Sequence, residues 1–130
     1  MTKSESRIQQ EIIRYYRNNF CLKHHDPQHI IFSVPNEMAA TTAGELTKLG
    51  VPKKTIQRFS SMLTGVFKAT GLLSGVSDLI VIQPQRVLFV EVKTPTGTQS
   101  KSQKWFQQTV ERLGFLYFIV HDLEEFKKII

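Results

Sequence analysis

Two acidic residues and one lysine stand at the ends of two neighbouring apolar segments of this chain. Asp78 opens the segment 79–82, and Glu91 and Lys93 close the segment 87–93. Side chains alternate between the two faces of a strand, so Glu91 and Lys93 project to the same side. If the segments pair as a hairpin, Asp78 and Glu91 meet at one end of it. Two carboxylates beside an ammonium group form a site for a divalent cation, and this combination suits phosphodiester hydrolysis.

An ordinary structural explanation exists for the same three residues. Asp78 could cap a turn, and Glu91 and Lys93 could be an exposed pair on a strand. The neighbouring residues argue against this explanation, because the flanking side chains are apolar and the pair shares the face of Phe89. Charges at the end of a half-buried strand are costly unless they are paired or bound to a metal. We therefore predict a metal site.

The elements that would position these residues are predicted from apolar periodicity and capping residues. Helices are predicted at residues 4–19, 53–69, 100–113 and 122–130. Strands are predicted at residues 30–34, 78–83, 86–93 and 115–120. The last strand is entirely apolar and is expected to be buried on both faces. Residues 36–50 are rich in small side chains, and we expect a loop there with room for one helical turn.

This order of elements predicts an α/β fold in one domain over residues 1–130. A small mixed sheet with helices on its faces is the natural packing. The connection from strand 86–93 through a helix to strand 115–120 would be a right-handed βαβ unit. The chain has 130 residues, which suits one core, and its 41% of hydrophobic residues argues against disorder.

Composition narrows the classes of partner and compartment. The net charge of +6 favours polyanionic partners. Cys21 is the only cysteine, so an internal disulfide is impossible and a cysteine-based zinc site is not expected. His24, His25 and His29 lack the helical spacing and the third soft ligand of a zinc site. With no signal region and no apolar run of roughly 20 residues, we expect a cytoplasmic protein that does not bind membranes.

The residues around the two acids resemble a known nuclease family. Asp78 followed by Glu91-Val92-Lys93 matches the PD-(D/E)xK signature. The Gly-Val-Ser-Asp sequence ending at Asp78, the Glu-Val-Lys-Thr sequence starting at Glu91, and Gln103 on the next helix resemble the virus-type replication-repair nuclease branch, the VRR-NUC domain. This resemblance implies a restriction-endonuclease-like αβββαβ core with flanking helices, a mixed sheet of the α+β kind.

The resemblance also implies a role for each matching residue. Asp78, Glu91 and the Val92 carbonyl are expected to bind Mg²⁺ or Mn²⁺, because these cations prefer hard oxygen ligands. Lys93 is expected to orient or help deprotonate the attacking water, or to stabilise the developing charge on the phosphate. Gln103 resembles the glutamine that lines the site of the family. The number of metal ions is left open.

The superfamily often adds a glutamate from its first helix. Glu5 is preferred here over Glu11, because apolar residues three and seven positions later place Glu5 on the inward edge of the helix. Glu37, just after the first strand, is a third candidate. Each of the three could instead be an ordinary surface charge.

The expected activity is metal-dependent endonucleolytic cleavage of DNA. Lysines that would neutralise phosphates, unless they merely line solvated helix faces, are Lys53, Lys54, Lys68, Lys101 and Lys104. Free-standing domains of this branch resemble phage or prophage Holliday-junction resolvases that act as homodimers. We therefore expect four-way junctions as substrates, in a bacterial or phage-infected cell. The alternatives are a nuclease for flap, nicked or linear duplex DNA, and a non-catalytic basic DNA-binding module.

Overall fold

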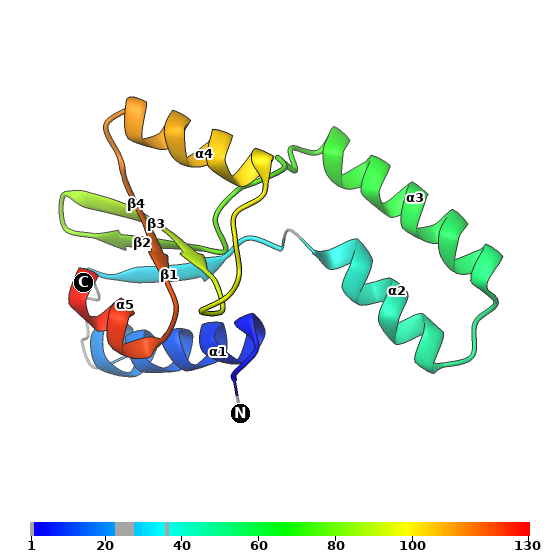
Figure 1. The fold of residues 1–130 in the computed structure, drawn as a ribbon, viewed down its shortest axis with the longest axis horizontal. Coiled ribbons are helices and arrows are strands. Elements are labelled where there is room, and N and C mark those ends of the chain that lie inside the picture. The colour runs from blue at the N-terminus through cyan, green and yellow to red at the C-terminus, as the bar shows by residue number, and fades with distance from the viewer. Residues whose placement is uncertain (1, 23–27, 36) are drawn as a thin grey trace. The chain divides into compact units, whose positions relative to one another are not determined.

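The computed structural model describes residues 2–22, 28–35 and 37–130 (Figure 1). The contacts of the chain gather into two compact units. The sheet unit comprises residues 1–34 and 75–130, and the helical unit comprises residues 35–74. The expectation of one nuclease domain over residues 1–130 stays a prediction. Among the described residues, no helix combines the length and the apolar character needed to cross a bilayer.

The sheet unit is built on four strands in the order β1-β2-β3-β4. Their bounds are β1 Ile30–Ser33, β2 Leu79–Gln83, β3 Arg86–Val92 and β4 Leu116–Val120. The strand β2 runs antiparallel to both β1 and β3, whereas β4 runs parallel to β3. The predicted hairpin of β2 and β3 is therefore confirmed, and so is the mixed sheet. The expectation that β4 is buried on both faces is wrong, because an edge strand leaves Leu116 42% exposed.

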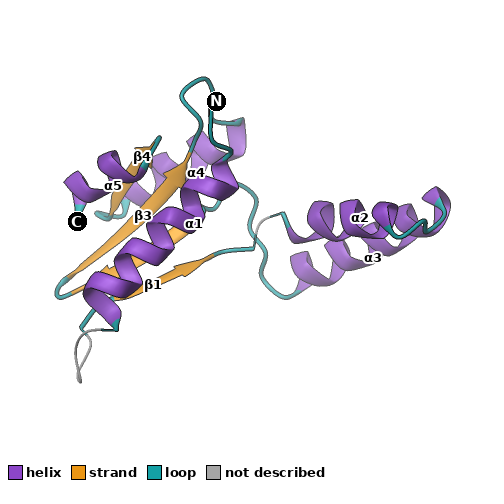
Figure 2. Cartoon of the chain, turned by 90° about the horizontal axis from the view of Figure 1, so that it is seen from below, coloured by secondary structure: helices purple, strands orange, loops and turns teal. Residues whose placement is uncertain are grey.

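Helices cover both faces of this sheet. Their bounds are α1 Glu5–Tyr16, which continues as a π-helical stretch over Arg17–Cys21, α4 Lys101–Arg112 and α5 Leu123–Ile129. The helices α1 and α5 lie on one face and α4 lies on the other (Figure 1). Seen from below, α1 crosses in front of the strands (Figure 2). The N-caps of α1 and α5 are Ser4 and Asp122, since Ser4 accepts a hydrogen bond from the backbone N–H of Arg7 and Asp122 accepts one from that of Glu125.

Alternation along β3 divides the core into two clusters. The face toward α1 and α5 carries Leu88, Val90 and Val92, which are fully buried in the larger cluster. The opposite face carries Phe89, which packs against the smaller cluster, formed by Phe106, Val110 and Tyr117. Glu91 belongs to this second face, so the predicted sharing of a face with Phe89 is confirmed.

The helical unit consists of two packed helices, α2 (Met38–Lys48) and α3 (Lys53–Ala69). The expectation of a loop over residues 36–50 is therefore wrong for Met38–Lys48, whereas residue 36 lies outside the described residues. The small residues there include three alanines, which favour a helix more than any other residue type. The hydroxyl groups of Thr42 and Thr47 donate to carbonyls four residues earlier, at 2.8 and 2.9 Å, so they are satisfied within the helix.

The bounds of α3 agree with the prediction, and the buried side of this helix is narrow. Ile56 is buried, and Leu63 and Phe67 are half-buried. On the same helix, Phe59 and Met62 are 44% and 70% exposed. Apolar spacing thus identified the helix, whereas the width of its buried stripe depends on what packs against it.

Candidate active site

Asp78 and Glu91 come together at the end of the β2–β3 hairpin. Asp78 directly precedes β2, and the pairing of Leu79 with Val90 places Asp78 opposite Glu91. The Oδ2 atom of Asp78 accepts a hydrogen bond from the backbone N–H of Val92 at 2.8 Å. This bond ties the first acid to the strand that carries the second one. The hairpin register therefore determines the distance between the two carboxyl groups.

The negative charge of Asp78 opposes the ionisation of Glu91. Glu91 is only 1% exposed. Burial is the main cause that raises the pKa of Glu91 to about 8, followed by the negative charge of Asp78 and a hydrogen bond between the two groups. The Tyr117 hydroxyl and the positive charge of Lys93 act in the opposite direction. A divalent cation would relieve the repulsion, so this set of hard oxygen donors fits such an ion.

In the part of the chain that the structure describes, two side-chain carboxylates converge at this place, those of Asp78 and Glu91. Among the described residues, no three His, Cys, Asp or Glu side chains form a group that could hold a metal ion. Such a site would draw its remaining ligands from backbone oxygens, water and substrate, as sites for Mg²⁺ usually do.

Gln103 links the start of α4 to Glu91. The Ser100 Oγ accepts a hydrogen bond from the backbone N–H of Gln103 at 3.2 Å, and the Gln103 Oε1 accepts one from the backbone N–H of Ser100 at 2.8 Å. This reciprocal capping box holds the glutamine side chain in place. Its Nε2 group then donates to the Glu91 Oε1 at 3.1 Å. One side chain therefore fixes both the helix terminus and one carboxylate oxygen.

A close approach at Gly75 allows α4 to reach this position. Gly75 has a φ of 88°, which side-chain-bearing residues rarely adopt. A Cβ atom there would lie 2.2 Å from the carbonyl oxygen of Ser102, in the first turn of α4. Only glycine meets both conditions. The glycine that begins the Gly-Val-Ser-Asp sequence therefore brings the turn carrying Gln103 against the end of the hairpin.

Tyr117 of β4 also contacts Glu91, a contact that was not predicted from the sequence. Its hydroxyl donates to the Glu91 Oε2 at 3.1 Å. Burial, followed by the charge of Glu91, raises the pKa of Tyr117 well above its usual range. The available signal was a tyrosine within an apolar strand, since a buried tyrosine hydroxyl usually has a hydrogen-bond partner.

Lys93 follows β3 directly and is only 8% exposed. Its backbone N–H donates to the Val120 carbonyl at 3.0 Å, so the chain at this point is still held by the neighbouring strand. Its positive charge lowers the pKa of Glu91. The structure therefore brings together Asp78, Glu91, Lys93 and Gln103.

The candidates for a further acid lie elsewhere or form other contacts. Glu5 is the first residue of α1 and is half-buried. Glu11 accepts a hydrogen bond from the Lys3 ammonium group at 2.8 Å. This hydrogen bond, and then the positive charge of Lys3, lower the pKa of Glu11. Glu37 is exposed in the helical unit. Within the described part of the chain, none of them forms a trio of acids with the pair on the hairpin, and the role of Glu5 stays a prediction.

The expected phosphate-binding lysines divide between the two units. Lys101 and Lys104 are exposed on α4, on either side of Gln103. Three more, in the helical unit and also exposed, are Lys53, Lys54 and Lys68. His24 and His25, considered above as zinc ligands, lie outside the described residues. The Nδ1 atom of His29 hydrogen-bonds the Tyr16 hydroxyl at 3.0 Å, which is a structural contact.

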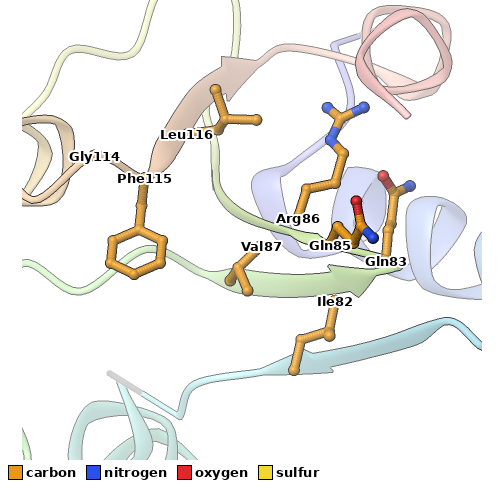
Figure 3. A pocket seen from close by; sticks show the side chains of 8 residues that line it. All are labelled: Ile82, Gln83, Gln85, Arg86, Val87, Gly114, Phe115 and Leu116. Atoms are coloured by element: carbon orange, nitrogen blue, oxygen red, sulfur yellow. The ribbon is translucent and has the colours of Figure 1, made fainter.

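A pocket of about 480 Å³ lies at the turn end of the hairpin, away from these acids (Figure 3). Its lining residues are Ile82, Gln83, Gln85, Arg86, Val87, Gly114, Phe115 and Leu116. Arg86, the only charged residue among them, donates to the Ile129 carbonyl at 3.0 Å. The pocket has no acid and no pair of titratable groups. We therefore place the candidate active site at Asp78 and Glu91 and not in this pocket.

Comparison with known proteins identifies the family of this chain and supports its fold. The sequence model of the VRR-NUC domain matches residues 4–122. A solved structure described as a VRR_NUC domain protein superposes with a TM-score of 0.62 at 17% sequence identity, over 99% of this chain and 86% of the other. This likeness supports the fold. A search of curated proteins found no match.

Proposed function

The chain belongs to the VRR-NUC family and is a nuclease of the PD-(D/E)xK type; we propose that it is a structure-selective DNA endonuclease that requires Mg²⁺ or Mn²⁺ and resolves four-way junctions. The observation that carries this proposal is the buried carboxyl group of Glu91, whose ionisation is opposed by the charge of Asp78 and favoured by that of the buried Lys93. DNA is the partner that a nuclease of this type implies.

The proposed metal ligands are the carboxylates of Asp78 and Glu91 and the carbonyl oxygen of Val92. A bound cation would supply Lewis-acid polarisation of the scissile phosphate and a more acidic water. The chain's own contribution is to hold the two carboxylates in place before the ion arrives. The Val92 backbone N–H fixes Asp78, and the Gln103 amide fixes one oxygen of Glu91.

Lys93 is proposed to act directly on the reacting atoms. Its positive charge acts on Glu91, and from this part of the site it would orient the attacking water or stabilise charge on the phosphate. Because Lys93 is largely buried, few water molecules would screen this charge. Glu5 is proposed as an additional acid that approaches the water molecules around the site.

Exposed lysines would hold the DNA backbone without reading its sequence. Lys101 and Lys104 flank Gln103 and would contact phosphates near the scissile bond. Lys53, Lys54 and Lys68 would contact phosphates further along the substrate. A homodimer, with two sites related by a two-fold axis, would suit the paired strands of a four-way junction. The proposed place of action is the cytoplasm of a bacterial or phage-infected cell.

The test is cleavage of a labelled four-way junction, compared with flap, nicked and linear duplex DNA, in the presence of Mg²⁺ or EDTA. We expect cleavage of the junction with Mg²⁺, none with EDTA, and none by the Asp78→Ala variant. Preferred cleavage of a flap or a linear duplex would replace the junction by that substrate. Metal-independent binding without any cleavage would indicate a DNA-binding module instead of an enzyme.

A further inference from the structure

The carboxylate of Glu91 receives two hydrogen bonds from two different elements. The Gln103 amide of α4 donates to the Oε1 atom, and the Tyr117 hydroxyl of β4 donates to the Oε2 atom, both at 3.1 Å. The glutamine belongs to the family resemblance, whereas the tyrosine does not. We propose that Tyr117 is a positioning residue that sets the orientation of Glu91 for metal binding. This inference rests on the proposed function of the site.

The position of the tyrosine hydroxyl is set by the core and not by the acid. Tyr117 is 8% exposed and belongs to the cluster with Phe106 and Val110. Its ring meets the Phe106 ring edge-on, with 6.3 Å between the ring centroids. The parallel register pairs Tyr117 with Phe89 on β3, which places both side chains on the face that carries Glu91. The ring is therefore held on several sides, and the hydroxyl forms a fixed anchor for the carboxylate.

The direction of the hydroxyl proton is also determined. The Gln99 Nε2 group donates to the Tyr117 hydroxyl oxygen at 3.2 Å and to the Gln107 Oε1 at 3.0 Å. The Gln107 Nε2 group in turn donates to the Glu111 Oε1 at 2.7 Å. Since Gln99 supplies a proton to the tyrosine oxygen, the single proton of the hydroxyl is free to point at Glu91. An ionised carboxylate only accepts hydrogen bonds, so it matches this donor.

One donor on each oxygen leaves the carboxylate able to bind a cation. A carboxylate offers about four lone-pair directions, and the two hydrogen bonds use one on each oxygen. The remaining directions stay available, while rotation of the group is restricted by anchors on two sides. Hydrogen-bond partners of this kind, one step removed from a metal, typically account for about 10- to 100-fold in metal affinity or activity.

The variant Tyr117→Phe removes the hydroxyl and keeps the ring that packs in the core. The matched control is Tyr16→Phe, because Tyr16 is a fully buried tyrosine on the opposite face of the sheet, with hydroxyl bonds to His29 and Gln83. Both variants lose one buried hydroxyl, so they should share a similar effect on thermal stability. Only the loss at Tyr117 should affect the metal site.

The experiment is titration of Mn²⁺ into the full chain without DNA, with free Mn²⁺ followed by electron paramagnetic resonance. We expect the dissociation constant of Tyr117→Phe to rise about 10-fold or more, and that of Tyr16→Phe to stay at the parent value. In junction cleavage, the half-saturating Mg²⁺ concentration should rise while the KM for DNA stays constant.

Four results would overturn the inference. Unchanged Mn²⁺ affinity in Tyr117→Phe, or an equal loss in Tyr16→Phe, would contradict a role at Glu91 while leaving the proposed function intact. Absence of Mn²⁺ binding by the parent chain would remove the metal site itself and the inference with it. If Tyr117→Phe does not fold, Gln99→Ala tests the same point, because it removes the donor that directs the tyrosine proton. Unchanged Mn²⁺ affinity in Gln99→Ala would then overturn the inference.

Discussion

Replacing Glu91 with glutamine is expected to stabilise the metal-free protein at alkaline pH and to abolish cleavage. The buried carboxyl group has a pKa of about 8 in the folded chain, compared with 4.5 for an unperturbed glutamate. Between these values, the folded protein keeps a proton that the unfolded chain has released. The free energy of unfolding of the metal-free protein therefore falls as the pH rises through this window.

The size of the effect follows from the two pKa values. From about pH 5.5 to about pH 8.0, the loss amounts to as much as about 3 kcal/mol, at 1.36 kcal/mol for each pH unit over which only the unfolded chain is ionised. For a chain of 130 residues, this corresponds to roughly 10 °C in Tm. A glutamine at this position keeps the shape and can still accept a hydrogen bond from Gln103, but it cannot ionise.

Thermal melts in EDTA at the two pH values test this reasoning. Other titrating groups are common to the parent and Glu91→Gln, so the difference between their pH-induced changes in Tm isolates Glu91. We expect the parent Tm to fall more than the variant Tm, and added Mn²⁺ at the higher pH to restore stability in the parent only. An identical pH dependence in both proteins would refute the conclusion that Glu91 is buried against Asp78.

Three further variants test other parts of the site. Gly75→Ala should lower cleavage, because the added Cβ atom would collide with the first turn of α4. The control is Gly114→Ala, since Gly114 also has a positive φ of 91° but a Cβ atom there would meet no atom within 4 Å. This control should lower the free energy of unfolding in urea by only about 1 kcal/mol and leave cleavage intact. Lys93→Ala should lose cleavage in single-turnover assays yet still bind Mn²⁺ in calorimetry. Joint replacement of Lys101 and Lys104 by alanine should weaken junction binding and reduce the salt slope by about 2 in fluorescence titrations.

The acids and the strands that carry them could be predicted from the sequence because their signals are local. The apolar segments around Asp78 and Glu91 predict the hairpin, and strand alternation predicts the side on which Glu91 lies. The capping pattern from Ser100 to Gln103 is equally local, since the cap and the glutamine are three residues apart. In these cases, spacing along the chain corresponds directly to position in space.

The features that were missed depend on contacts between distant segments. Tyr117 reaches Glu91 only because β4 lies parallel to β3, and the sequence does not state the register of two strands separated by a helix. The apolar composition of β4 likewise predicts a strand without showing that it lies at the sheet edge. Residues 36–50 were misjudged for a different reason, because small side chains are common both in loops and in alanine-rich helices such as α2.

The central claim is that Asp78 and Glu91 together hold a divalent cation beside Lys93. Anomalous diffraction from a crystal soaked in Mn²⁺ tests it most directly. The account predicts one strong peak between the two carboxylates and the Val92 carbonyl, at about 2.0–2.3 Å from their oxygens, and its loss in Asp78→Asn. A crystal that shows Mn²⁺ elsewhere, with no peak between these two side chains, would contradict it.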